Sequence, residues 1–168
     1  NNLWTYEGKI LTNGDTKYNL EDDVINIIDI NNSRIIYQAN NETKIVKLDN
    51  DKITETHSLP TQQIIYNHST NRWETWSWWE LWTIHNNGNV ELFNRSGEKM
   101  INVNPLDQHG VLLLSNESKI TGLNPSYYIS HELFSNGKIK KIFTNVAERE
   151  IYFWGTVANQ TGIFELEY

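Results

Sequence analysis

The sequence predicts an all-β protein from its composition, its turn signals and its hydrophobic pattern. Ile, Thr, Tyr and Trp are abundant, whereas alanine is present only as Ala39, Ala147 and Ala158, a balance that favours strands over helices. Asparagine clusters such as Asn86-Asn87-Gly88-Asn89 separate short apolar runs, and Asn-Gly between such runs is a strong hairpin signal. No long stretch has a 3.6-residue period. We therefore expect one domain over residues 1–168, built as a sandwich or a barrel.

The expected strands are the short apolar-rich runs between these turns. In chain order they cover residues 3–10, 24–30, 34–38, 44–48, 62–66, 73–84, 90–93, 99–103, 110–114, 118–123, 127–130, 138–143, 150–154 and 162–166. Residues 73–84 are interpreted as one long strand, although Ser77-Trp78-Trp79-Glu80 formally matches a helix capping box.

Four segments resemble one another, each with a strand, a polar turn and a second strand. They begin at Arg34, Glu80, Gly110 and Glu150, so their starts lie 46, 30 and 40 residues apart. Even spacing would indicate a β-propeller. The uneven spacing favours ordinary hairpins of a β-meander, and a small propeller stays open as the alternative fold.

Composition and charge exclude several classes of function. Without cysteine the chain has no disulfide and no thiolate zinc site. Its net charge of -7 disfavours nucleic acid as a partner. The longest apolar runs, such as Gly110 to Leu114, are too short to cross a bilayer. The start at Asn1 has no signal-peptide character, and we expect it to be a boundary within a longer protein.

No catalytic or metal-binding motif stands out. The five histidines, at His57, His68, His85, His109 and His131, have no metal-ligand spacing. Neighbouring carboxylates, Asp22 with Asp23 and Glu148 with Glu150, are interpreted as solvated charges of turns and edges. We therefore expect no metal, no cofactor and no enzymatic activity, with a hydrolase on a β-scaffold as the competing hypothesis.

Tryptophan is concentrated between residues 73 and 82. On one strand, Trp76, Trp78 and Trp82 would share one face, and Trp73 and Trp79 the other. Aromatic faces suit the apolar faces of sugar rings, so Trp76, Trp78 and Trp79 are candidate glycan-binding residues. The alternative is that these rings form core and cross-strand contacts.

One segment resembles a known family. Residues 61–73 combine a strand with Asn67-x-Ser69-x-x-x-Trp73, which is similar to a strand and turn in the trypsin-released head of the rotavirus outer-capsid spike protein. Three further segments look like parts of that family: Asn31-Asn32-Ser33-Arg34, Asn104-Pro105-Leu106 and Ser126-Tyr127-Tyr128-Ile129-Ser130. The chain lacks the late cysteines and the C-terminal helix of the best-known members, so the resemblance implies a divergent group.

The resemblance implies a galectin-like β-sandwich of two antiparallel sheets, which binds host cell-surface oligosaccharides, either sialosides or histo-blood-group glycans, for attachment. The glycan-contacting arginine of the family corresponds to Arg34, and its tyrosine pair to Tyr127 and Tyr128. Ile129 stands in the place of the family's serine, with Ser130 one position away. The alternative for Arg34 is a structural ion pair with an acidic neighbour such as Glu21 or Asp22.

The resemblance also implies a location and partners. The domain would be made in the host cytoplasm and displayed on the virion, joined to the rest of the spike, with no membrane insertion of its own. On that hypothesis the six Asn-x-Ser/Thr sequons carry no glycan; they lie at Asn31, Asn41, Asn67, Asn94, Asn116 and Asn159. The competing hypothesis is a lectin or scaffold fragment of a β-propeller surface protein.

Overall fold

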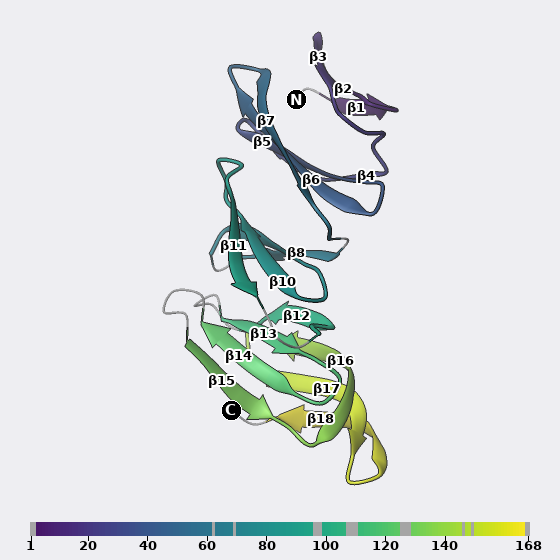
Figure 1. The fold of residues 1–168 in the computed structure, drawn as a ribbon, viewed down its shortest axis with the longest axis vertical. Helices are drawn as coiled ribbons and strands as arrows, with labels where there is room; N and C mark the ends of the chain where they lie inside the picture. Colours follow the sequence, from purple (N-terminus) through teal and green to yellow (C-terminus); the bar gives the residue numbers. More distant parts are fainter. Residues whose placement is uncertain are drawn as a thin grey trace.

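The computed structural model describes residues 3–61, 63–68, 70–95, 99–106, 111–124, 129–145, 147–148 and 150–166. Within these ranges the secondary structure consists of strands and turns, and no helix there could cross a membrane. The strands form five antiparallel sheets, which we call sheets 1 to 5. Figure 1 shows the sheets stacked along the long axis of the molecule, with the chain beginning at one end of the stack.

Each sheet is made of strands that follow one another in the sequence. Sheet 1 contains β1 (Trp4–Glu7), β2 (Ile10–Asn13) and β3 (Thr16–Asn19), and sheet 2 contains β4 (Asn26–Asn31), β5 (Arg34–Ala39), β6 (Glu42–Asp49) and β7 (Lys52–Leu59). Sheet 3 contains β8 (Gln63–Asn67), β9 (Arg72–Trp76), β10 (Glu80–Ile84) and β11 (Val90–Arg95). Sheet 4 contains β12 (Asn102–Pro105), β13 (Leu112–Ser115), β14 (Ile120–Asn124) and β15 (Ile129–Phe134), and sheet 5 contains β16 (Gly137–Asn145), β17 (Glu150–Val157) and β18 (Gln160–Leu166).

The predicted β-sandwich of two sheets is therefore wrong, although the all-β class is right. The four similar segments are hairpins of four different sheets: β5–β6, β10–β11, β13–β14 and β17–β18. In sheet 3 the segment is the last strand pair, whereas in sheets 2, 4 and 5 it is the second and third strands. This offset of one strand makes the spacing of the repeats uneven.

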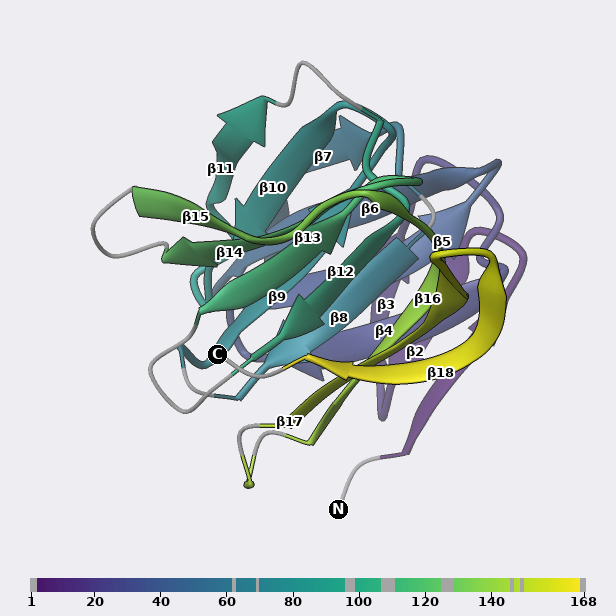
Figure 2. The same ribbon diagram turned by 90° about the horizontal axis from the view of Figure 1, so that it is seen from below.

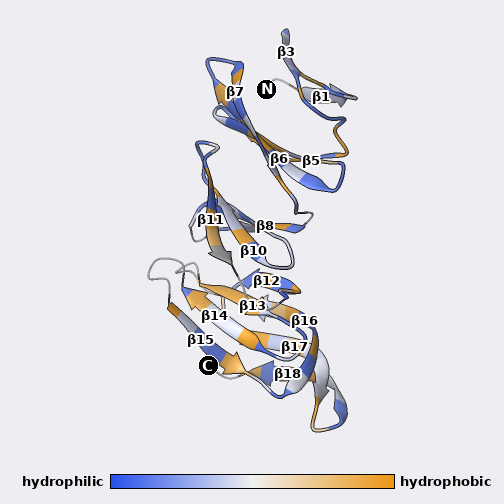
Figure 3. Ribbon diagram, in the orientation of Figure 1, coloured by the Kyte–Doolittle hydropathy of each residue, from blue (hydrophilic) through white to orange (hydrophobic). Residues whose placement is uncertain are grey.

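The hydrophobic core is divided into four layers, one between each pair of successive sheets. In β5, Ile35 and Tyr37 pack against sheet 1, while Ile36 between them packs against sheet 3. In β13, Leu113 lies in the layer with sheet 5, whereas its neighbours Leu112 and Leu114 lie in the layer with sheet 3. The central strands thus bury both faces, which explains their continuous apolar runs. Figure 3 shows β13 coloured as a hydrophobic strand, and Figure 2, seen from below, shows the sheets overlying one another.

Residues 73–84 form a hairpin, so the predicted single strand is wrong. Backbone N–H of Ser77 donates to the carbonyl of Glu80 at 2.9 Å, and Ser77 Oγ accepts from the N–H of Glu80 at 3.3 Å. The predicted sharing of faces fails with it, because Trp76 faces sheet 4, Trp82 faces sheet 2, and Trp78 and Trp79 are exposed in the turn. The local polar bonds of Ser77 outweigh the strand preference of the aromatic run.

Two-residue turns with positive φ at both positions close several hairpins, as the asparagine clusters predict. Asn40 and Asn41 have φ of 47° and 64°, and Asn50 and Asp51 have φ of 49° and 59°. The turn between β17 and β18 has the same form, with φ of 48° at Ala158 and 66° at Asn159. Alanine is strained there because its Cβ approaches the following carbonyl in the left-handed region.

We expect Ala158→Asn to raise the free energy of unfolding by about 0.5–1 kcal/mol, because asparagine tolerates the left-handed region. Urea unfolding of the two proteins measures the difference. As the reverse change in the same turn, Asn159→Ala should lower stability by a similar amount. An unchanged urea midpoint for both variants would contradict this account of the turn.

Glu74 is a carboxylate buried within the layer between sheets 3 and 4. It is 2% exposed, lies on the same face of β9 as Trp76, and accepts a hydrogen bond from Thr83 Oγ1 at 2.7 Å. Burial raises the pKa of Glu74 to about 7, although the hydrogen bond from Thr83 and the charge of Arg72 both act in the opposite direction.

We expect Glu74→Gln to stabilise the protein at neutral and alkaline pH. Because the folded pKa lies above the ordinary value of 4.5, the stability present at low pH is lost as the pH rises to about 7. The variant should exceed the wild type by about 2–3 kcal/mol at pH 8 and equal it near pH 4. Thermal unfolding across this range is the measurement, with the exposed Glu91→Gln as control. Equal stability of wild type and Glu74→Gln at pH 8 would refute the buried charge.

Candidate functional site

The candidate site lies where the β4–β5 turn of sheet 2 meets sheet 3. Asn31 and Arg34 face each other across a turn of two residues. The Asn31 Oδ1 atom accepts from the backbone N–H of Ser33 at 2.8 Å and from that of Arg34 at 2.9 Å. This local bonding is what asparagine offers in turns, and it fixes the start of β5, where the Arg34 side chain enters the layer between the sheets.

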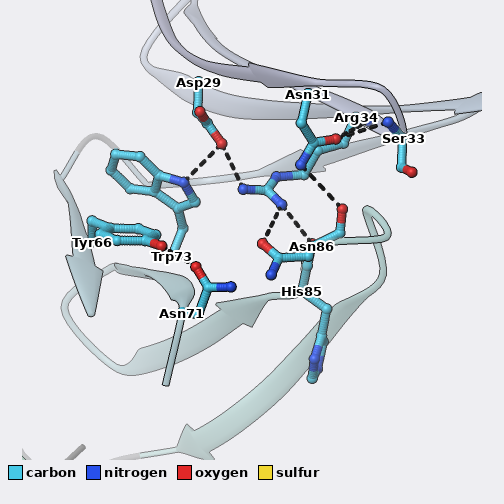
Figure 4. Close-up of polar contacts among 9 residues, drawn as sticks. All are labelled: Asp29, Asn31, Ser33, Arg34, Tyr66, Asn71, Trp73, His85 and Asn86. Atoms are coloured by element: carbon cyan, nitrogen blue, oxygen red, sulfur yellow. Dashed lines mark hydrogen bonds and ion pairs between the residues drawn. The ribbon is translucent and has the colours of Figure 1, made fainter. Parts of the chain in front are cut away.

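The guanidinium of Arg34 connects the two sheets (Figure 4). Its Nη2 contacts Asp29 Oδ2 at 2.6 Å, while Nη1 donates to the carbonyl of His85 at 3.1 Å and to Asn86 Oδ1 at 3.0 Å. Arg34 is 1% exposed, and its Nε has no hydrogen-bond partner. A planar group with several fixed donors suits such a cross-sheet contact.

Asp29 is shared between the arginine and a tryptophan of sheet 3. The same Oδ2 atom that pairs with Arg34 accepts from Trp73 Nε1 at 3.0 Å. Asp29, Arg34 and Trp73 therefore form one cross-sheet clamp, in which the two opposite charges neutralise each other within the site.

Gly88 allows the β10–β11 turn to approach sheet 2 closely. It is buried with φ of +82°, and a Cβ at this position would lie 2.6 Å from Lys47 Cγ and 3.4 Å from Arg34 Cβ. Only glycine combines that backbone conformation with so little space. The Asn-Gly pair thus places the His85 carbonyl and Asn86 within reach of Arg34.

The clamp forms the floor of an open cleft of about 620 Å³ between sheets 2 and 3. Its rim carries Tyr66, whose ring centroid lies 5.0 Å from that of Trp73 and 4.7 Å from that of His68. The Tyr66 hydroxyl donates to Asn71 Oδ1. The lining residues are Asp29, Asn31, Arg34, Tyr66, His68, Asn71, Trp73 and Asn86. Aromatic rings and amides of this kind can hold a polar, uncharged ligand.

A second, charged cleft lies beside the first. It contains Glu55 with His57 at 3.1 Å and Glu91 with His85 at 3.2 Å. His85 joins the two clefts, since its carbonyl accepts from Arg34 while its ring contacts Glu91. Among the described residues, no group of three or more His, Asp or Glu side chains could hold a metal ion.

The structure does not bring the predicted glycan-binding residues together. Arg34 lies in the clamp, where its pairing agrees with the structural alternative, with Asp29 in place of Glu21 or Asp22. Ser130 is exposed on β15 of sheet 4, and Trp78 and Trp79 are exposed in a turn of sheet 3. Trp76 is buried in the layer with sheet 4. Tyr127 and Tyr128 lie outside the described residues.

Sequence reasoning missed most residues of the cleft. Tyr66, His68, Asn71 and Trp73 come from the β8–β9 hairpin, and Asp29 comes from sheet 2. The hairpin was visible as a strand followed by an asparagine turn. Its position against Arg34 depends on the order in which the sheets stack, which single-sequence patterns do not specify.

Comparison with known proteins identifies the architecture. The sequence matches no protein-family model and no curated protein. Among solved structures, the WD40 β-propeller domain of Doa1 aligns with a TM-score of 0.53 and 11% identity, over 98% of this chain and 63% of that one. Hsv2 of Kluyveromyces lactis gives 0.53 and 10%, over 88% and 52%, and the N-terminal domain of Nup159 gives 0.52 and 10%, over 86% and 44%.

The fold is that of a β-propeller. The five sheets correspond to propeller blades, and the chain spans about half the length of the propeller structures that it matches. This overturns the resemblance to the rotavirus spike head, and with it the galectin-like sandwich, the viral attachment function and glycan binding on that basis. The Asn67-to-Trp73 pattern describes a β-hairpin with an asparagine turn, which unrelated all-β proteins share.

We expect Arg34→Ala to lower the free energy of unfolding by about 2–3 kcal/mol. The change removes the guanidinium donors of Asp29, the His85 carbonyl and Asn86, and breaking a buried pair is costly. The remaining hydrogen bond from Trp73 and the partial exposure of Asp29 reduce the cost. Urea unfolding measures the loss. In a double-mutant cycle with Asp29→Ala the two losses should not add, and additive losses would show that the Asp29–Arg34 pair contributes nothing to the stability of the clamp.

Proposed function

We propose that this chain is part of a propeller-type recognition domain. Its cleft between sheets 2 and 3 would bind an uncharged, extended segment of a partner protein and catalyse no reaction. The observation that carries the proposal is the composition of the cleft: aromatic rings and amide groups at the rim, above an ion pair that is already satisfied.

The charges of the cleft favour an uncharged ligand. Asp29 and Arg34 are paired at 2.6 Å, and Trp73 takes a further hydrogen-bonding position of Asp29. A strongly charged ligand would have to compete with this pair, and the buried guanidinium does not reach the surface. The same engagement argues against a catalytic role, because neither charged group is free to transfer a proton or to stabilise a reacting centre.

The amides of the rim suit the backbone of an extended peptide. The side-chain oxygen of Asn71 accepts a hydrogen bond from Tyr66, and that of Asn86 accepts one from Arg34. The amide oxygens are therefore in use, and the NH2 groups of the same side chains would donate to the ligand. Peptide carbonyls are acceptors that match these donors. The rings of Tyr66 and His68 offer apolar area for a side chain at low entropic cost. Turns that converge at the edge of a rigid scaffold are common binding positions.

Selection of phage-displayed random peptides against the purified chain tests the proposal. We expect enrichment of peptides with uncharged polar and apolar residues. His68→Ala and Tyr66→Leu should each weaken binding of the selected peptides about five- to tenfold in a binding titration, because aromatic side chains contribute strongly to such contacts.

His131→Ala serves as the matched control, since His131 is an exposed histidine of β15 outside this cleft. Its peptide affinity should equal that of the wild type. The proposal fails if no peptide is enriched, or if the selected peptides bind the Tyr66 and His68 variants as tightly as the wild type.

A further inference from the structure

Sheets 1 and 5, at the two ends of the stack, differ in the polarity of their outer faces. In sheet 5, the residues on the outer face are defined by the strand register. Lys141 pairs with Trp154, which pairs with Ile163, and Phe143 pairs with Tyr152, which pairs with Glu165. The alternate residues Ile142, Ile151 and Phe153 are buried against sheet 4.

The outer face of sheet 5 is apolar and exposed at its centre. Phe143 is 42% exposed, Trp154 is 43% exposed and Ile163 is 70% exposed. Lys140 Nζ lies 4.7 Å from the Trp154 ring centroid, and Lys141 Nζ lies 5.2 Å from that of Phe143, so flexible lysines are the groups above these two rings. Adjacent large apolar residues on one sheet face indicate an interaction surface.

The outer face of sheet 1, by contrast, is mostly polar. Leu11 and Tyr18 point toward sheet 2, so the opposite face carries the alternate residues. These are Thr5, Glu7, Ile10, Thr12, Lys17 and Asn19. Stacked sheets require a polar outer face at a free end. Sheet 1 has such a face and sheet 5 does not.

We propose that the outer face of sheet 5 binds the same face of a second copy of the chain. The two copies would pack face to face, in the same way as successive sheets pack within the molecule through alternate apolar side chains. The outer face of sheet 1 offers Ile10 as its single large apolar residue among polar neighbours, which disfavours head-to-tail association. A two-fold axis is the simplest way to pair identical surfaces.

Positive and negative residues lie at opposite edges of the outer face of sheet 5, so two copies of this face can be complementary in charge. β17 is the central strand, with the lysines Lys138, Lys140 and Lys141 on β16 at one edge and Glu165 on β18 at the other. A two-fold axis along β17 places β16 of one copy over β18 of its partner, so Lys141 approaches Glu165 across the interface. Along the strand the two residues are offset by two positions, ~7 Å, which a lysine side chain can span. Trp154 then packs near the axis, against its own symmetry mate.

Sedimentation velocity of the purified chain over a concentration series tests this pairing. We expect a dimer of twice the 19.7 kDa mass of the single chain. Ile163→Glu, the substitution least able to disturb folding because of its exposure, should raise the dissociation constant about 100-fold, and Trp154→Glu should do the same. Ile10→Glu is the matched control: Ile10 is 42% exposed on the outer face of sheet 1, and its dimer should be unaffected.

Charge exchange tests the orientation. Lys141→Glu and Glu165→Lys should each weaken the dimer about tenfold, and the double variant should recover it. Circular-dichroism melts of every variant identify those that fail to fold. A monomer at all concentrations would overturn the proposal and leave this face to a further blade of a longer polypeptide. Dimerisation that survives Ile163→Glu, or is lost equally with Ile10→Glu, would also overturn it.

Discussion

The need to bury both faces of every internal sheet is the constraint on which this structure depends. A sheet between two others has no solvent side, so both faces of β5 and β13 carry buried apolar residues, and successive residues belong to different layers. A slip of one residue in such a strand exchanges one apolar face for another, and burial alone specifies the register weakly. The asparagine turns with positive φ supply the missing specification, because a turn of two residues fixes which strand positions pair.

Polar side chains of sheet 2 give the layers on its two sides a particular alignment. Arg34 can satisfy its guanidinium only when Asn86 and the His85 carbonyl of sheet 3 lie above it. Lys44, another buried cation, has 2.9 Å contacts to Asp22 and Glu42. Burial disfavours its charge, but the hydrogen bonds to these two carboxylates prevail and raise the pKa of Lys44. Apolar contacts hold the sheets together, while these pairs select one relative position.

Local structure could be predicted from the sequence much further than the architecture. The hairpins beginning at Arg34, Glu80, Gly110 and Glu150 were recognisable, since strand–turn–strand patterns are set by neighbouring residues. The number of sheets could not be predicted, because the one-strand offset in sheet 3 makes the spacing of the similar segments uneven. β7 was not predicted, because most of its residues are polar and are typical of a loop. Residues 73–84 were predicted as one strand, whereas the hydrogen bonds of Ser77 form a turn within them. Of the site, Arg34 was identified, but its partners His85 and Asn86 come from sheet 3, and their position depends on the order of stacking, which no local pattern encodes.

The assignment of every sheet to consecutive strands has a consequence for how the molecule opens. Because no strand among the described residues crosses from one sheet to another, each sheet can detach without unthreading the rest, and only one apolar layer is lost at an end. Sheet 1, with three strands of four residues each, has the least to hold it. Amide protons should therefore exchange fastest in sheet 1 and slowest in sheet 3, the sheet farthest from either end of the stack.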